Sequence, residues 1–508
     1  MTEPASVSST PSTPSSSPVG SALQGKAGAI TLSLVGYLFF VEFVSGVLQG
    51  YYVPLISDLV AYLGIRDADF NWFEAAQLLL SALVVPVLAK LGDMVGHKRI
   101  LLISTVLTAG ASWWLVFADT FWVFLIAWAL QGFYVVWLPL EVALIFDRGR
   151  RTSTGASQTR RAAGYLVVAL EAGAIAGALG GARIFAAFNE NVALTLSIPA
   201  IAVTVAFFAI WFGVPESTPQ PGRRLDTTGF VLLTIALLTI TSGLTFLRIN
   251  GPATWWVYVL MLVGLLLLYP FGRWVLKHPD PAIDLRVLRQ PSMWPVQLTA
   301  GLVGISILGA QAPLSTFAGT DPANGFGLGL DASERSYIIG AYLVAMIIGA
   351  LLFPLVSRRT TPRIALISAT VLVAIGYLAF LVNNATVVGV TLNMVVAGIG
   401  SGALVAALPA AAAAAAPLGQ TGIATGLTNT TKTIGGAFAS AIFAVVLAMS
   451  AGQLVTETAS SLAGYLAVFA ICGGSAVVAA LALLVVPKLA FADTAPELDA
   501  EPTPSAQP

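Results

Sequence analysis

Charged residues are scarce in this sequence of 508 residues: only 9% are Asp, Glu, Lys or Arg, whereas 57% are hydrophobic. A water-soluble domain carries about 25% charged residues. The chain therefore has too little charge to cover a water-exposed surface, and its mean hydropathy of +0.88 points the same way. We predict an all-α protein that spans a lipid bilayer.

Cysteine and histidine are almost absent. The single cysteine, Cys472, excludes an internal disulfide or a cysteine metal cluster. The two histidines, His97 and His278, fall outside the apolar runs, and neither H-E-x-x-H nor G-x-x-x-x-G-K-[ST] occurs. We expect no metal, no cofactor and no catalysed reaction. Because Lys+Arg (24) equals Asp+Glu (24), nothing indicates a nucleic-acid partner.

Long apolar runs, by contrast, fill the chain. A helix needs about 20 apolar residues to cross the hydrocarbon core. Fourteen runs satisfy this length, so the sequence predicts fourteen transmembrane helices. Their approximate ranges are 30–53, 71–91, 100–118, 120–146, 163–186, 191–213, 229–248, 254–275, 293–317, 336–356, 363–381, 385–409, 421–449 and 463–486.

The runs and the regions between them divide the chain into five parts. Residues 1–27 and 488–508 are rich in Ser, Pro, Thr, Glu or Ala, and we expect disordered tails there. Two six-helix halves are predicted at 28–214 and 291–487. The part between them, 215–290, holds two extra helices, which we expect to lie peripherally and to contribute little to a transport pathway.

The positions of Lys and Arg predict the orientation. If both termini are cytoplasmic, the inner loops hold seventeen of these residues, at 90–99, 148–161, 223–224, 273–289 and 358–363. The outer side then holds four: Arg66, Arg183, Arg248 and Arg335. We therefore expect both termini on the cytoplasmic side of the plasma membrane.

The loop after the second helix contains a recognisable pattern. Residues 89–99 read AKLGDMVGHKR, which resembles G-x-x-x-D-R-x-G-R-R/K, the loop signature of major facilitator transporters. Asp93, Gly96 and Lys98 match, followed by the basic Arg99, whereas His97 replaces a basic residue. The resemblance implies a latch between the two halves.

The fifth helix resembles the antiporter signature G-x8-G-x3-G-P-x2-G-G of drug:proton exchangers. Gly164, Gly173 and Gly177 have its spacing and Gly181 follows, with Ala178 at the proline position. Glycines at 173, 177 and 181 recur every four residues and form one small face, which lets a neighbouring helix approach closely.

A third signature places an arginine three residues before a Gln-Gly pair in the fourth helix. Gln131 and Gly132 are present, but Trp128 stands at the arginine position. The segments 223–229, 283–288 and 428–436 are similar to segments of the fourteen-helix drug:proton antiporters. The chain thus resembles the major facilitator superfamily, and this antiporter family within it, over about residues 30–486.

The resemblance implies a major facilitator fold of two six-helix halves with two extra helices between them. It also implies a monomeric transporter that exports an apolar or cationic small molecule in exchange for protons, driven by the proton gradient alone. Substrate, protons and lipid would be its partners. A uniporter or importer of another solute stays open, and a membrane receptor or intramembrane enzyme is the alternative of a different class.

Four glutamates interrupt the apolar runs: Glu42, Glu74, Glu141 and Glu171, on the first, second, fourth and fifth helices. A charge at bilayer depth costs at least about 2.5–3.5 kcal/mol on insertion scales, so each needs a reason. A carboxyl group in an apolar interior holds its proton more tightly than in water, which suits a proton carrier. All four are therefore candidates for proton coupling.

The acids differ in depth and in neighbours. Glu42 is central and lies on a polar stripe, so we expect it to be the main coupling residue, with Glu171 second. Glu74 and Glu141 are near the predicted interfaces, where simple solvation is the alternative. Lys432 is the only basic residue deep in a predicted span, and we expect it to be the long-range partner of Glu42.

The substrate cavity is predicted from the remaining polar residues within the spans: Gln49, Gln77, Gln131 and Lys432. Gln49 shares a helical stripe with Glu42, and Gln77 shares one with Glu74. Glu171 lies about 200° around the fifth helix from Gly173, so we expect it to point away from the glycine face.

Overall fold

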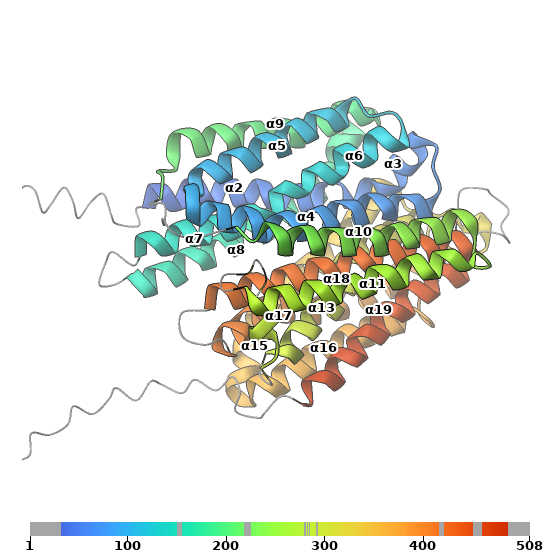
Figure 1. Cartoon of the computed structure of the whole chain (residues 1–508). Coiled ribbons are helices and arrows are strands. Elements are labelled where there is room, and N and C mark those ends of the chain that lie inside the picture. Colours follow the sequence, from blue (N-terminus) through green and yellow to red (C-terminus); the bar gives the residue numbers. More distant parts are fainter. Residues whose placement is uncertain are drawn as a thin grey trace, which may run out of the picture.

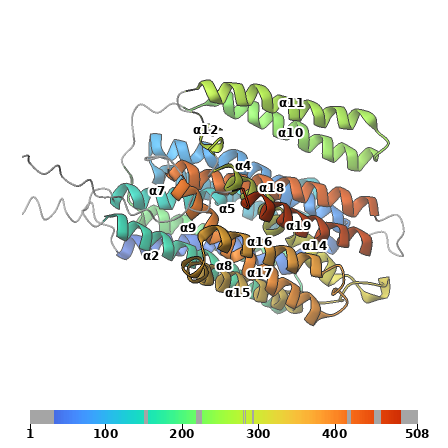
Figure 2. The same ribbon diagram turned by 90° about the horizontal axis from the view of Figure 1, so that it is seen from below.

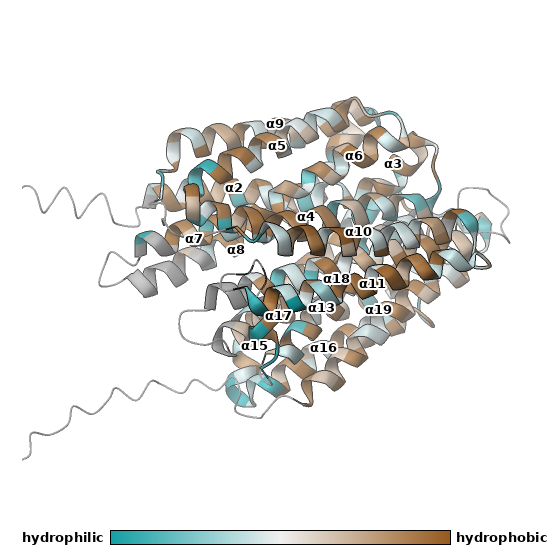
Figure 3. Ribbon diagram, in the orientation of Figure 1, coloured by the Kyte–Doolittle hydropathy of each residue, from teal (hydrophilic) through white to brown (hydrophobic). Residues whose placement is uncertain are grey.

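The computed structural model of the protein describes residues 32–149, 155–217, 225–278, 281, 283, 285–290, 293–415, 421–450 and 460–485. Both predicted tails lie outside these residues. Within them, fourteen helices are long and apolar enough to cross a membrane. The predicted all-α fold with fourteen spans is therefore confirmed, and Figure 3 shows apolar residues along most of their length.

The first six spans form the N-terminal half. Its helices are α2 (Leu32–Tyr51), η1 (Val53–Leu55), α3 (Ile56–Leu63), α4 (Asp67–Val95), α5 (His97–Val116), α6 (Phe121–Gln131), η2 (Gly132–Val136), α7 (Trp137–Gly149), α8 (Gly155–Ala187) and α9 (Val192–Gly213). The first span continues through η1 and α3 to Leu63, beyond the predicted end at residue 53, because α3 is apolar as well.

The last six spans form the C-terminal half. Its helices are α13 (Trp294–Gly309), α14 (Gln311–Gly319), η3 (Pro322–Asn324), α15 (Ala332–Arg359), α16 (Pro362–Ala379), α17 (Val387–Ala415), α18 (Thr421–Ser450) and α19 (Leu462–Leu483). Each half has its own apolar core, one built mainly from residues 34–214 and the other mainly from 293–483. Figure 1 shows the two halves side by side.

Local sequence signals start several of these helices. Asp331 and Glu334 form a capping box at α15, in which each side chain accepts a hydrogen bond from the other residue's backbone N–H. The Asn191 side chain accepts from the Leu194 N–H at α9, and Ser461 accepts from Gly464 at α19. These caps satisfy backbone donors that have no partner within the helix.

Three spans are divided rather than continuous. The first is divided at η1, the fourth at η2, and the ninth at Ala310, between α13 and α14. In the ninth span Pro313 lacks the N–H that an unbroken helix would donate to the Gly309 carbonyl. The division makes α14 a separate helix of nine residues.

The two extra spans are α10 (Thr227–Asn250) and α11 (Trp255–Lys277), followed by the short α12 (Leu285–Leu288). Figure 2 shows α10 and α11 as a pair on one side of the bundle. Their apolar side chains form a shared core with Leu79 and Leu83 of α4 and with Leu427 and Ala437 of α18. The pair therefore covers the seam where α4 of one half meets α18 of the other.

Candidate functional site

One end of the helical bundle carries Asp58, Asp67 and Arg335 and is called the Asp58 end. The opposite end carries the 93–99 loop and is called the His97 end. Buried acids lie along the helices between these ends.

Glu42 of α2 and Glu141 of α7 lie together inside the N-terminal half. Their exposed fractions are 1% and 0%, and they interact electrostatically with each other. The Ser45 side chain hydrogen-bonds to Glu42, and the Tyr134 ring is near enough to interact with it. No hydrogen-bond partner is described for either oxygen of Glu141. Two carboxyl groups are thus held next to each other in an apolar interior.

Burial corrects the expectation that Glu74 and Glu141 could be solvated near the interfaces. Glu74 is 7% exposed and Glu141 is fully buried. The reason is that other helices cover both side chains. Glu74 meets α14 of the other half, where its carboxyl accepts a hydrogen bond from the Ala312 N–H, and Glu141 lies beside Glu42 of α2.

Glu171 of α8 and Lys432 of α18 attract one another across the boundary between the halves. Both side chains are half-buried although both lie well inside their helices, and Tyr342 of α15 is near Glu171. The expected pairing of Lys432 with Glu42 is corrected by this finding. The carboxyl that attracts Lys432 is Glu171, because the fifth span, and not the first, brings its acid to α18.

The predicted glutamines have different surroundings. Gln131 is 1% exposed, and its Nε2 donates to the Tyr52 hydroxyl and to the Ser112 hydroxyl, each at 2.9 Å. This amide therefore joins the first, third and fourth spans of the N-terminal half. Gln77 is half-buried and Gln49 is exposed. A small cavity of about 20 Å³, the space of one water, is lined by Asn429 and Lys432 among other residues of α13, α17 and α18.

Trp128, at the arginine position of the family signature, belongs to an aromatic cluster. Its ring centroid lies 4.9 Å from that of Tyr52, 5.3 Å from Phe70 and 5.6 Å from Phe124. The side chain is 4% exposed. This position therefore packs α6 against the first two spans.

The glycine face of α8 packs on α2. A Cβ atom added to Gly173 would lie 2.0 Å from the Phe43 carbonyl oxygen, and one added to Gly177 would lie 2.7 Å from that of Val47. Gly181 meets Tyr51 in the same way, whereas Gly164 has nothing within 4 Å of that position. Three of the four predicted glycines thus set the α2–α8 contact.

The 93–99 loop is anchored to the end of α9 and the residues after it. Glu216 accepts the Lys98 N–H at 3.0 Å and pairs with Arg99 at 3.6 Å, and the Lys98 ammonium donates to the Trp211 carbonyl at 2.9 Å. Gly96 has φ +118°, and a Cβ there would lie 2.5 Å from Glu216 Oε1. Only glycine fits this turn.

His97 has a structural place in the same loop. Its ring is 3.2 Å from Asp93 Oδ1 and 2.7 Å from the Ser217 hydroxyl, and the residue is 4% exposed. These described partners are in the N-terminal half or just after it. A contact from the loop to the other half stays a prediction.

The Asp58 end carries contacts between the halves that the sequence analysis did not name. Arg335 of α15, 2% exposed, forms an ion pair with Asp58 of α3. The Tyr465 hydroxyl of α19 donates to Asp67 Oδ2 at 2.9 Å. Ser57 donates to the Ser315 carbonyl at 3.1 Å. The sequence offered one signal for the ion pair: Arg335 lies one turn into α15, a helix that starts at the Asp331–Glu334 capping box.

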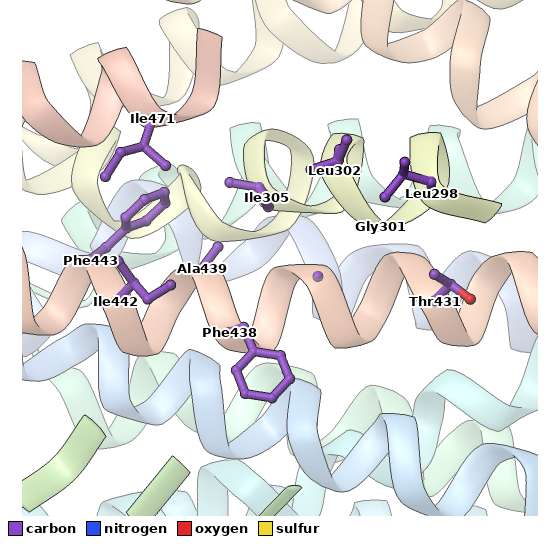
Figure 4. A pocket seen from close by; sticks show the side chains of 11 residues that line it. Leu298, Gly301, Leu302, Ile305, Thr431, Phe438, Ala439, Ile442, Phe443 and Ile471 are labelled. Carbon is purple, nitrogen blue, oxygen red and sulfur yellow. The ribbon is translucent and has the colours of Figure 1, made fainter. Parts of the chain in front are cut away.

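A groove of about 240 Å³ lies between α13 and α18, beside α19 (Figure 4). Apart from Thr431, its lining is apolar, and no predicted site residue contributes to it. The groove is therefore separate from the acids. Among the described residues, no group of three or more His, Cys, Asp or Glu side chains could hold a metal ion.

Comparison with known proteins decides the family. The model of the Major Facilitator Superfamily matches residues 38–440. The chain belongs to the Major Facilitator Superfamily. This membership makes it a transporter rather than a member of an enzyme family.

Individual relatives differ in what they carry. A cephamycin export protein of Amycolatopsis lactamdurans is 27% identical over 79% of this chain and 82% of its own length. A uridine/deoxyuridine transporter of Lactococcus lactis subsp. cremoris (strain MG1363) is 23% identical over 60% of this chain, a match that spans 63% of that transporter's length. The solved structure of a nucleoside transporter matches with a TM-score of 0.60 at 14% identity, over 90% of this chain and 98% of that one. This structural likeness shows the fold alone.

Proposed function

We propose that this facilitator is a secondary active transporter that exports an apolar or cationic small molecule in exchange for protons. The main support is the Glu171–Lys432 pair, in which an acid and a base from different halves are both half-buried in the middle of their helices. Major facilitators bind substrate at the interface of two repeats near the bilayer midplane. A charge pair at that interface can be broken and remade as substrate or protons bind.

The orientation is part of the proposal. The excess of Lys and Arg in the loops at the His97 end favours a cytoplasmic location for that end and for both termini. The Asp58 end then faces outward, where the Arg335–Asp58 and Tyr465–Asp67 contacts close it. In this orientation the outer end is the closed one in the described conformation.

The export direction rests on two supports. The antiporter-like glycines at 173, 177 and 181 form the α2–α8 contact, and one relative is named as a cephamycin export protein. Uptake of a nucleoside is the second candidate, because another relative is named as a uridine/deoxyuridine transporter. We propose a monomer in the plasma membrane with no cofactor besides the proton gradient.

Reconstitution tests these alternatives directly. Purified protein in proteoliposomes is given an imposed pH gradient of either sign, and transport of a cationic dye, a cephalosporin and uridine is followed. Exchange with protons predicts that transport against the substrate gradient occurs with the pH gradient and ceases when an ionophore collapses it. Uridine flux that ignores the pH gradient would instead establish facilitated uptake and refute the export proposal.

A further inference from the structure

Two carboxylates of α4 are linked to the same short helix of the other half, Glu74 directly and Asp67 through the Tyr465 hydroxyl of α19. Asp67, Asn71 and Glu74 have i, i+4, i+7 spacing and lie on one face of α4, with the two carboxylates about 10 Å apart along the helix axis. At the inner position Glu74 accepts the Ala312 N–H of α14. At the outer position Asp67 accepts from Tyr465, whose hydroxyl also lies 3.0 Å from Thr316 Oγ1 of α14.

The helix that Glu74 and Asp67 hold, α14, is distinct from α13. The ninth span is divided at Ala310, so α14 is a nine-residue helix that can tilt relative to α13. Ala312 is in its first turn, where backbone N–H groups lack partners within the helix and the helix dipole favours a negative charge. Glu74 is 7% exposed, and its Oε2 has no hydrogen-bond partner among the described residues.

We propose that Glu74 is the proton-sensitive point of a two-point clasp, Glu74 and Asp67, by which α4 holds α14 and keeps the outer end closed. The inference rests on the proposed exchange of protons. A proton that binds a Glu74 carboxylate oxygen converts a charge-assisted hydrogen bond to the Ala312 N–H into a neutral one, which is about half as strong. No covalent bond other than the new O–H forms.

Glu74 and Asp67 have different charged neighbours, and we therefore give them different roles in the clasp. Facing Glu74 are the Ala312 N–H from α14 and the Tyr134 phenol from η2, while α18 presents Gly436 against Leu78 of the same helix. No fixed positive charge from these described elements opposes proton uptake there.

Asp67 has a cationic neighbour instead. It interacts electrostatically with Arg335 and accepts hydrogen bonds from Tyr465 and from the Ser460 N–H. Asp67 is therefore the fixed anchor, and Glu74 is the point that releases.

Spin labels on the two halves can report the opening. Cys472 is the only cysteine, so Cys472→Ala gives a cysteine-free background. Labels at Ala61→Cys in α3 and Val382→Cys after α16 occupy exposed positions outside the clasp. Electron–electron distance measurements in nanodiscs, without substrate or gradient, compare pH 8 with pH 5.5. We expect the ratio of long to short distances to rise about tenfold at the lower pH.

The variants separate the two points. Glu74→Gln should give the long distances at both pH values, whereas Asp67→Asn should lengthen some distances at pH 8 and keep the pH response. Asp321→Asn, which changes an exposed carboxyl at the same end, should behave as the parent does.

A parent protein without any pH response, or a Glu74→Gln variant that keeps the parent's response, would overturn the clasp. Because the readout is conformational, a transporter that proves not to exchange protons would refute the proposed function independently of this result.

Discussion

The Glu171 carboxyl of α8 and the Lys432 ammonium of α18 face each other across the boundary between the two halves, and neither is fully buried. Because one partner comes from each half, any rocking of the halves changes their separation. Removal of one partner leaves an uncompensated charge at bilayer depth, which costs about 3–5 kcal/mol in a fully buried pair and less at a half-buried one.

Lys432→Met should abolish most transport and lower the thermal midpoint of the detergent-solubilised protein, and Glu171→Gln combined with Lys432→Met should recover the midpoint but not the transport. Lys277→Met, which removes an exposed lysine at the end of α11, is the control. If the double variant melts no higher than Lys432→Met, the two residues do not form a pair.

The α2–α8 contact gives a prediction with a control in the same helix. Gly173→Ala places a methyl group 2.0 Å from the Phe43 carbonyl, so the helices must separate, at a cost of about 1–3 kcal/mol. Gly164→Ala meets open space and should be neutral. Thermal midpoints followed by size-exclusion chromatography compare the two, and equal midpoints would show that the contact is not close-packed.

The 93–99 loop should act in the conformational cycle rather than in folding. Asp93→Asn keeps the size of the side chain and removes the charge that lies beside His97. We expect the protein to fold and its transport rate in proteoliposomes to fall about tenfold or more. Asp119→Asn, at an exposed position between α5 and α6, is the matched control. A normal rate for reconstituted Asp93→Asn would remove the latch role.

The extra pair of spans should be dispensable for the pathway itself. The hydroxyls of Thr239 and Thr241 donate to carbonyls of their own helix, at 2.7 and 2.8 Å. Their hydrogen-bond donors are therefore satisfied without a bound substrate. Thr239→Val, Thr241→Val and Ser242→Ala are therefore expected to transport normally. Changed substrate preference in any of the three, measured by competition in proteoliposomes, would place α10 at the pathway.

The transmembrane spans could be predicted because each one is a single uninterrupted stretch of sequence with a required length. Hydrocarbon thickness fixes the length of each apolar run, so every span after the first could be located within a few residues of its bounds. The first span is the exception, because it continues through α3 to Leu63. The division of the ninth span could not be predicted, since Pro313 near a helix start and Pro354 inside the unbroken α15 look alike in sequence. Packing decides which proline coincides with a break.

The site was predictable in its residue types and only partly in its pairings. A glutamate within an apolar run stands out in any sequence, so the four acids were found. Asp58 and Arg335 are 277 residues apart, and each looks like an ordinary loop-proximal charge until the halves are brought together. The pairing of Lys432 with Glu171 rather than Glu42 likewise depends on which span packs near α18, and a helical stripe carries no such information.

Glu42 remains the acid expected to couple transport to the proton gradient, with Glu171 as the second candidate. It is 1% exposed in the middle of α2, and its neighbour Glu141 places a second carboxyl within electrostatic reach. Two acids side by side offer a route for one proton through an apolar interior, which Glu171, engaged by Lys432, does not.

Glu42→Gln should therefore abolish accumulation of substrate against its gradient in proteoliposomes with an imposed pH gradient. Exchange of labelled for unlabelled substrate at equal concentrations should continue, because the glutamine retains the size and hydrogen-bonding groups that close packing requires. Glu334→Gln, a change at an exposed carboxyl at the start of α15, is the control and should accumulate substrate normally. If Glu42→Gln accumulates substrate and Glu171→Gln does not, coupling belongs to α8, and accumulation by both variants would exclude this pair of carboxyls as the coupling site.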